Sequence, residues 1–305
     1  MVQSARLPRS TRLALKAWVN TVRCAAVRLF RSYGSDELLR AIRSLGIAAD
    51  NTVMVHRDFE PHHGFRGSTD ELINVFLAAV GPTGHLLMPS LPYRSSSLAY
   101  LKSGRRFDVR RTVSMMGMVS ELFRRRAGVL RSVHPTHPIL AWGPQADRFV
   151  AAHPRCRYPC GPGSPFDELA LVQGKVLFFN AGFATITFFH WLEHMVHNQL
   201  PFALYTDEPF NVPVIDADGH ERTVTTYVFA EDAIRRRRFE RFEQAMRARG
   251  AIRACRVGNS QLLAVDLKDA IECTQDMLRA GRIFYELSEP GAASHATAPP
   301  RAPMR

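Results

Sequence analysis

One stretch of the sequence carries residues suited to moving a proton. His190 and Glu193 stand three residues apart, and the apolar spacing around them predicts a helix over residues 187–199. Side chains at this spacing share one face of a helix, so the carboxylate can reach the imidazole. A carboxylate in this position selects the tautomer of the ring and stabilises the imidazolium that forms when the ring takes a proton. We therefore interpret the two residues as an acid–base pair, and an ordinary surface pair is the alternative.

Metal binding is a second function that these residue types could have. The order His190-x-x-Glu193-His194 has the form of an inverted zinc-protease helix. Separately, Cys156 and Cys160 form a cysteine pair with a histidine nearby. A third ligand at suitable spacing is not evident for the first set, and no second pair at zinc spacing accompanies the cysteines. We therefore predict no metal site.

Alternating strands and helices position these residues. The first predicted strand covers residues 51–56, a helix covers 71–81, and a second strand covers 85–90. A strand–helix–strand run this short predicts a parallel βαβ unit with a right-handed crossover. Further elements are predicted along the chain: a helix over 114–123, a strand over 139–143, a helix over 143–153, a strand over 174–182, a hairpin around Asp218-Gly219, a helix over 230–250, strands within 252–265 and a helix over 266–281.

The bulk composition suits a folded intracellular enzyme. The chain has 305 residues, of which 46% are hydrophobic, and this is enough to bury a full core. Its five cysteines are an odd number without a secretory signal, so we expect reduced thiols and a cytoplasmic location. The basic run Arg235–Arg238 is flanked by acids on its predicted helix and lacks stacking aromatics. We interpret it as a solvated face and expect no nucleic-acid partner.

The positive charge gathers at the N-terminus. The net charge is +12, and residues 1–35 supply seven of these charges without any acid. Within residues 1–34 the apolar side chains recur at helical spacing, which predicts a basic amphipathic helix. Such a helix suits peripheral contact of residues 1–33 with an anionic membrane surface. A helix that packs on the body or frays is one alternative, and an organelle transit peptide is another.

Several segments, taken together and in order, resemble one enzyme family. They are LLRAIRSLGIAADNTVMVH, GPTGHLLMPS, TVSMMGMVSELFR, RSVHPTHPILAWGPQA, HPRCRYPCGPGSPFDELALVQGKVLFF, the His190-x-x-Glu193 helix and RVGNSQLLAVDLKDAIECTQDML. Over about residues 35–285 the chain resembles the aminoglycoside 3-N-acetyltransferase family. The resemblance implies an α/β fold, a three-layer sandwich with a mixed, largely parallel central sheet and helices on both faces. The acetyltransferase domain is then expected over residues 35–288, followed by a disordered tail over 289–305.

The resemblance also implies a reaction. The family transfers an acetyl group from acetyl-CoA to an amine of an aminocyclitol ring, so we expect this chain to use acetyl-CoA or another acyl-CoA. Its acceptor is expected to be a small amine on an aminoglycoside-like or amino-sugar molecule. A base must take the proton of the amine, and donors must face the thioester oxygen. The family's cysteine-free chemistry implies direct transfer rather than an acyl-cysteine intermediate.

The matching segments imply which residues take part. Four are expected to be catalytic, and six to contact the acyl-CoA. The catalytic set is His134, His137, His190 and Glu193, and the cofactor set is His56, Arg57, Ser114, Met116, Gly117 and Ser164. Which of the histidines is the base stays open, and a loop histidine without a role is the alternative for His134 and for His137. The loop before Ser164 and the predicted helix start at Ser114 also suit a plain turn and an ordinary cap.

Two departures from the family pattern bear on the substrate. Where the family has Val-His-Ser-Ser, this chain has Val55-His56-Arg57-Asp58, and Arg57 could meet a phosphate or a carboxylate. Where the family carries Asp-x-Asn-Thr, this chain reads Ala184-Thr185-Ile186-Thr187, so an acid has gone. Aminoglycosides are polycations and need an acidic cleft. We therefore expect an amino sugar, a sugar nucleotide, a biosynthetic amine or an anionic acceptor, and a ligand-binding or regulatory protein without turnover is the alternative.

Overall fold

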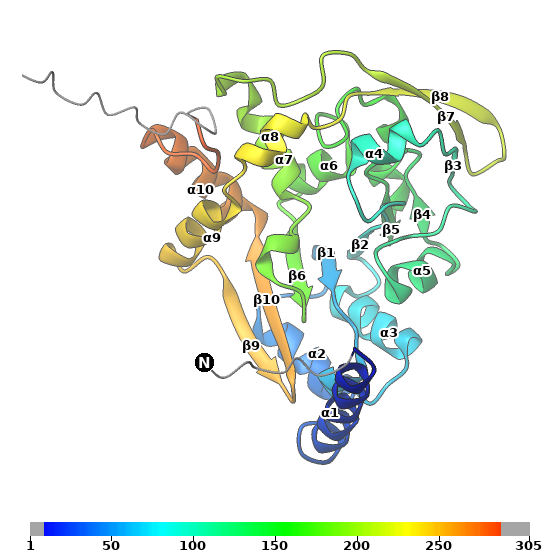
Figure 1. The fold of residues 1–305 in the computed structure, drawn as a ribbon, viewed down its shortest axis with the longest axis vertical. Coiled ribbons are helices and arrows are strands. Elements are labelled where there is room, and N and C mark those ends of the chain that lie inside the picture. The colour runs from blue at the N-terminus through cyan, green and yellow to red at the C-terminus, as the bar shows by residue number, and fades with distance from the viewer. Residues whose placement is uncertain (1–8, 288–305) are drawn as a thin grey trace, which may run out of the picture.

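A mixed seven-stranded sheet forms the centre of the protein. The computed structural model describes residues 9–287, and its strands lie in the order β4-β5-β2-β1-β6-β10-β9 (Figure 1). Their bounds are β1 Thr52–Arg57, β2 His85–Pro89, β4 Leu130–Arg131, β5 Ile139–Trp142, β6 Lys175–Phe179, β9 Arg253–Val257 and β10 Ser260–Asp266. The strands β2, β1 and β6 run parallel, which confirms the predicted βαβ unit.

Parallel pairing in this sheet is confined to its centre. The other four of the six pairings in this sheet are antiparallel, and they lie on both sides of the parallel centre. The reason lies in the connections. The strands β9 and β10 are joined by a tight turn, and such a turn can only produce antiparallel neighbours. The mixed sheet with helices on both faces is otherwise as expected.

Alternation along the central strands divides the core into two layers. Val53 and Val55 of β1 face a layer that contains α2, α3 and α5, whereas Met54 faces the opposite layer. The first layer holds α2 Ser35–Ser44, α3 Thr69–Val80 and α5 Met118–Arg124. The second holds α6 Pro165–Leu171, α7 Phe189–Val196, α8 Glu231–Arg236, α9 Phe239–Ala248 and α10 Leu267–Arg279. This is the three-layer sandwich, and α7 brings the predicted acid–base pair into the second layer.

A small second sheet lies at the edge of the molecule. It has the order β3-β7-β8, with β3 Phe107–Asp108, β7 Phe210–Ile215 and β8 Glu221–Thr226 (Figure 1). The strands β7 and β8 form the predicted antiparallel hairpin around Asp218-Gly219. Short helices fill the connections: α4 Ser97–Lys102, η1 Pro61–His63, η2 Ala146–Phe149, η3 His153–Arg155, η4 Phe183–Thr185 and η5 His197–Gln199.

The N-terminal helix α1 extends over Arg9–Phe30, and this confirms the helix predicted within residues 1–34. It lies at one end of the molecule, drawn in dark blue in Figure 1. Val27 is buried, while Trp18, Leu29 and Phe30 are between 64% and 80% exposed. None of the helices formed by residues 9–287 is long and apolar enough to cross a membrane. The tail predicted to be disordered, residues 289–305, lies outside the described residues.

Three predicted helices differ from the structure. The helix expected from residue 114 begins only at Met118, because Gly117 has a φ of 103° that a helix cannot continue through. The helix expected over 143–153 is reduced to the short 3-10 helix Ala146–Phe149. The helix expected over 230–250 breaks between α8 and α9, where Arg237 adopts an extended ψ of 131°. The last difference shapes the candidate site.

Candidate active site

Glu193 is the centre of the candidate site. It lies on α7 and its side chain is fully buried. Oε2 accepts a hydrogen bond from Nδ1 of His190 at 2.7 Å, as expected for the pair. Since a carboxylate can only accept, this contact places the proton of His190 on Nδ1 and leaves Nε2 as the free basic nitrogen. The His190 side chain is 22% exposed, so part of the ring is accessible from outside the protein.

Arg237 and Tyr285 hold the carboxylate from the other side. Arg237 donates from Nε to Oε1 at 2.6 Å and from Nη2 to Oε2 at 3.0 Å, a bidentate pair. The hydroxyl of Tyr285 also donates to Oε1. Glu193 is therefore fixed by three side chains, and its orientation in turn fixes the ring of His190.

The ionisation of Glu193 follows from these contacts. Burial alone would raise the pKa of the carboxyl. The Arg237 guanidinium and the hydrogen bonds from His190 and Tyr285 outweigh the burial, and they hold the pKa of Glu193 below its ordinary value. The carboxylate is therefore charged at neutral pH and can stabilise an imidazolium at His190.

The role of Arg237 was missed in the sequence, where the whole run Arg235–Arg238 was interpreted as a solvated face. That interpretation is wrong for Arg237, because the chain leaves the helix there. The amide of Arg238 donates to the carbonyl of Phe284, and Arg237 pairs with Tyr285 in a short bridge. The exposed Arg235 does follow the expectation and pairs with the surface residue Asp232. The contact of residues 284–285 with the arginine run therefore makes Arg237 point inward, whereas Arg235 stays at the surface.

A group of buried histidines lies next to the pair. The ring of His137 packs edge-on against His190 with centroids 5.5 Å apart. His134 lies behind it, 6.5 Å from His137, and stacks on His153 at 4.3 Å. Nδ1 of His134 accepts hydrogen bonds from the amides of Thr136 and His137, so this ring shapes its own turn. Of the predicted catalytic residues, the structure therefore brings His137, His190 and Glu193 together and places His134 one layer further in.

Burial keeps these histidines neutral. It lowers the pKa of His134 and that of His137 well below the ordinary value, and the charge of neighbouring histidines lowers them further. A neutral His137 can donate or accept a hydrogen bond beside His190 without competing for its proton. His190, which alone of the three touches Glu193, is the base that the geometry favours.

A pocket opens where the parallel strands β1 and β6 end. It has a volume of about 370 Å³, and the predicted cofactor residues His56, Arg57 and Met116 line it. Ligands of open α/β sheets bind at such carboxyl ends. Nε2 of His56 accepts a hydrogen bond from the amide of Thr187, at 3.3 Å, and the carbonyl of Thr187 accepts from the amide of His190. The pocket therefore adjoins the first turn of the helix that carries the acid–base pair.

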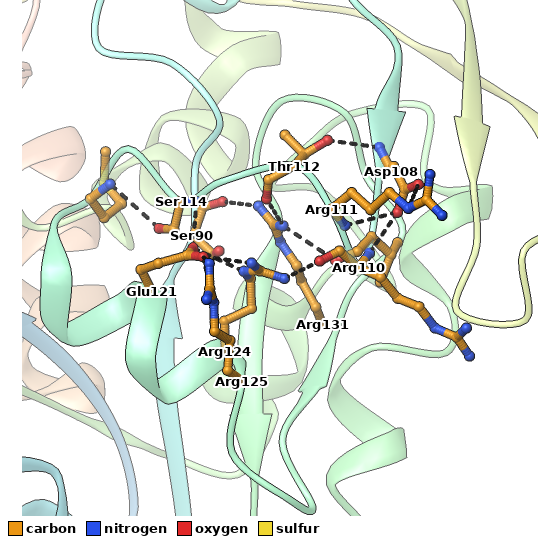
Figure 2. A network of polar contacts seen from close by, with 12 residues as sticks. Ser90, Asp108, Arg110, Arg111, Thr112, Ser114, Glu121, Arg124, Arg125 and Arg131 are labelled. Atoms are coloured by element: carbon orange, nitrogen blue, oxygen red, sulfur yellow. Dashed lines mark hydrogen bonds and ion pairs between the residues drawn. The ribbon is translucent and has the colours of Figure 1, made fainter. Parts of the chain in front are cut away.

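The remaining predicted cofactor residues lie elsewhere or are already occupied. The amide of Ser114 donates to the Glu121 carboxylate, which also binds Arg124 and Arg125 (Figure 2). Ser114 is therefore not the helix cap that was expected, and its amide is not free for a phosphate. Gly117 is exposed next to the Arg57 guanidinium.

Ser164 has a structural task of its own. It is fully buried, and its hydroxyl accepts a hydrogen bond from the amide of Asp167 at the start of α6. Ser164 is thus an ordinary helix cap, whereas the alternative that the sequence left open for this loop was a plain turn. Ser164 does not line the pocket at the end of β1.

Cys156, Cys160 and His153, the candidate metal ligands from the sequence, lie close to the buried histidines. Both ring nitrogens of His153 are engaged, with the Ser132 hydroxyl and the Pro159 carbonyl. Burial raises the pKa of Cys156 to about 11, and it raises the pKa of Cys160 well above the ordinary value. Protonated thiols are poor nucleophiles and poor metal ligands.

Comparison with known sequences decides the family. The family described as Aminoglycoside 3-N-acetyltransferase matches residues 54–279. The chain belongs to this family. Its matched region covers most of the strand β1 before the pocket and the whole of the helix α7, which carries His190 and Glu193.

Individual family members share this fold at low identity. The aminoglycoside N(3)-acetyltransferase III of Salmonella sp is 26% identical over 168 residues, which is 51% of this chain and 58% of the relative. The chain thus spans a little over half the length of this curated relative. A solved structure of AAC-VIa bound to sisomicin is 25% identical with a TM-score of 0.68, covering 82% of this chain and 99% of that one. A binary structure of AAC-IIIb with CoASH has a TM-score of 0.68 at 23% identity, covering 82% and 97%.

Proposed function

We propose that this protein transfers an acyl group from an acyl-CoA thioester to the amine of a small acceptor. The main support is the buried Glu193 that holds Nδ1 of His190, because this arrangement makes Nε2 a competent base. Nε2 takes the proton as the amine attacks the thioester carbonyl, and Glu193 stabilises the resulting imidazolium. When the carbon–sulfur bond breaks, the coenzyme leaves as a thiolate, which takes the proton from the imidazolium to give the thiol and restores neutral His190. Cys156 and Cys160 do not take part, since burial raises the pKa of both thiols and keeps them protonated.

The two substrates have separate places in this proposal. The pocket at the end of β1 receives the acyl end of the thioester, with His56 and Met116 among its walls. The amine approaches His190 from the exposed side of its ring. AAC-VIa with its bound sisomicin supports an amine-bearing acceptor, and AAC-IIIb with its CoASH is in keeping with a coenzyme A thioester. The acid lost before α7 favours an acceptor with less positive charge than an aminoglycoside.

Isothermal titration with acetyl-CoA tests the donor. Free coenzyme A and ATP serve as controls, because a basic protein can attract any polyphosphate. We expect acetyl-CoA to bind about tenfold more tightly than ATP, a difference of about 1.4 kcal/mol. Equal binding of the two, or no binding of acetyl-CoA, would contradict acyl transfer and favour a ligand-binding protein.

We also propose that α1 attaches the protein to an anionic lipid surface. Its exposed apolar residues, among them Trp18, Leu29 and Phe30, have no partner among the described residues that covers them. Arg23 and Arg28 are exposed on the same helix, and the sequence has no acid before Asp36. An apolar stripe with flanking arginines suits the boundary between headgroups and acyl chains.

Sedimentation with vesicles tests this attachment. The protein is expected to bind phosphatidylglycerol vesicles and not phosphatidylcholine vesicles, and the variant Leu29→Glu is expected to stay in solution. Self-association of α1 without vesicles, or equal binding of both lipids, would contradict the proposal. The exposed Leu171→Glu on α6 is the matched control.

A further inference from the structure

Arg57 stands out in the pocket at the end of β1. It is the only arginine or lysine among the residues that line this pocket, and its side chain is half-buried. Its guanidinium donates to the carbonyl of Met116 and, at 2.6 Å, to the hydroxyl of Ser120. Its Nε is buried and has no hydrogen-bond partner within residues 9–287. The positive charge therefore has only neutral oxygens in direct contact.

Three other inward-facing arginines each bind a carboxylate, whereas the buried Arg131 donates its hydrogen bonds to backbone carbonyls and does not line this pocket. Arg237 makes a bidentate pair with Glu193, Arg253 pairs with Asp266, and Arg124 pairs with Glu121. For Arg57 no carboxylate lies within ion-pair distance among the described residues. The neighbouring Asp58 also lines the pocket, but it is exposed and acts on Arg57 only at longer range than an ion pair. A half-buried cation whose direct contacts are all neutral attracts an anion more strongly than a paired one.

Arg57 keeps its charge despite the burial. Burial lowers the pKa of Arg57 to about 10, and Asp58 opposes this change. At neutral pH the guanidinium is thus protonated, and a carboxylate or phosphate in the pocket would meet a full positive charge. The serine hydroxyl and the Met116 carbonyl fix the plane of the guanidinium from one side.

We propose that Arg57 selects a substrate that carries an acidic group, by binding its carboxylate or phosphate in this pocket. The inference rests on the proposed acyl transfer and names its substrate class. The acid can come from either substrate. It is the far carboxylate of an acyl chain, as in malonyl-CoA, or it is a phosphate on the amine acceptor, as in glucosamine 6-phosphate, which would extend from the side of His190 into the pocket beside the acyl end.

Binding to the wild-type protein distinguishes the two sources. One arm compares malonyl-CoA with acetyl-CoA by titration, and the other compares glucosamine 6-phosphate with glucosamine. We expect the acidic ligand to bind about tenfold more tightly than the neutral one in one of the two arms. In Arg57→Met, which keeps the side-chain volume and removes the charge, this preference should disappear while the neutral ligand binds as before.

The control variant is Arg148→Met. It removes the same charge from an exposed residue that pairs with Glu168 and does not line the pocket, so it should leave the preference unchanged. Thermal melts establish whether the variants fold. If Arg57→Met does not fold, the two comparisons made on the wild-type protein still decide the inference. Equal affinity for acidic and neutral ligands in both arms, or a preference that survives in Arg57→Met, would overturn the inference. If acetyl-CoA binds tightly but no acidic ligand is preferred, the inference about Arg57 fails and the proposed acyl transfer stands. If no coenzyme A ester binds, acyl transfer fails, and the comparison of glucosamine 6-phosphate with glucosamine still tests Arg57.

Discussion

At the scale of single residues, the proposed chemistry depends on a carboxylate that cannot move. Glu193 is buried and accepts from His190, Arg237 and Tyr285, so its position costs no reordering during the reaction. A fixed carboxylate keeps the proton of His190 on Nδ1 and the lone pair on Nε2. The isosteric change Glu193→Gln removes the negative charge and keeps the side-chain volume. It therefore tests both the orientation of the His190 ring and the charge that stabilises its imidazolium.

We expect Glu193→Gln to lower kcat by about a hundredfold or more, as for the loss of general-base catalysis. The Kd for acetyl-CoA should stay close to that of the wild type, because Glu193 does not line the pocket at the end of β1. Release of coenzyme A thiol under saturating substrate measures kcat, and titration measures Kd. The exposed Glu240→Gln is the control. A variant with full kcat would show that His190 is not oriented by this carboxylate.

At the scale of elements, the break between α8 and α9 builds the site. Arg237 leaves the helix with an extended backbone, and this turns its guanidinium inward onto Glu193. Breaking a buried ion pair by removing one partner leaves the other charge without compensation. We expect Arg237→Gln to lower the free energy of unfolding by about 3–5 kcal/mol.

Urea unfolding at pH 7.5 measures this loss. Arg235→Gln, two positions earlier, removes an exposed arginine that pairs with the exposed carboxylate of Asp232, and it should change stability by no more than about 0.5 kcal/mol. If the two variants unfolded alike, the inward pair would contribute no more than a surface contact. The comparison separates a buried arginine from an exposed one within a single run of four.

The same break shows where prediction from the sequence stops. The strands β1, β2, β6 and the β7–β8 hairpin were predictable, because their apolar patterns and the Asp218-Gly219 turn are local signals. The His190–Glu193 contact was predictable as well, since helical spacing alone places the two together. The break at Arg237 was not, because residues 230–250 favour a continuous helix and only Phe284 and Tyr285, far along the chain, interrupt it.

At the scale of the whole molecule, several histidines are buried in a neutral state. Burial lowers the pKa of His56 and that of His153 to about 3, and His134 and His137 shift in the same direction. In the unfolded chain a histidine has a pKa of about 6.5. Below pH 6.5 the unfolded chain therefore binds protons that the folded protein does not, and the folded state loses stability as the pH falls.

We expect the free energy of unfolding to be highest above about pH 7 and to fall steadily from pH 6.5 toward pH 5, with each such histidine contributing up to about 1.4 kcal/mol per pH unit. The carboxylates whose pKa is lowered, such as Glu193 and Glu121, stabilise the folded protein, and this stabilisation is lost only at more acidic pH, where the carboxylates of the unfolded chain begin to take up protons. Urea unfolding at a series of pH values measures the slope. His56→Gln keeps an acceptor for the Thr187 amide and removes one titrating ring, so its slope should be shallower. A stability that stays level between pH 7 and pH 5 would mean that these rings take up protons in the folded state, and His137 would then compete with His190 for the proton of the amine.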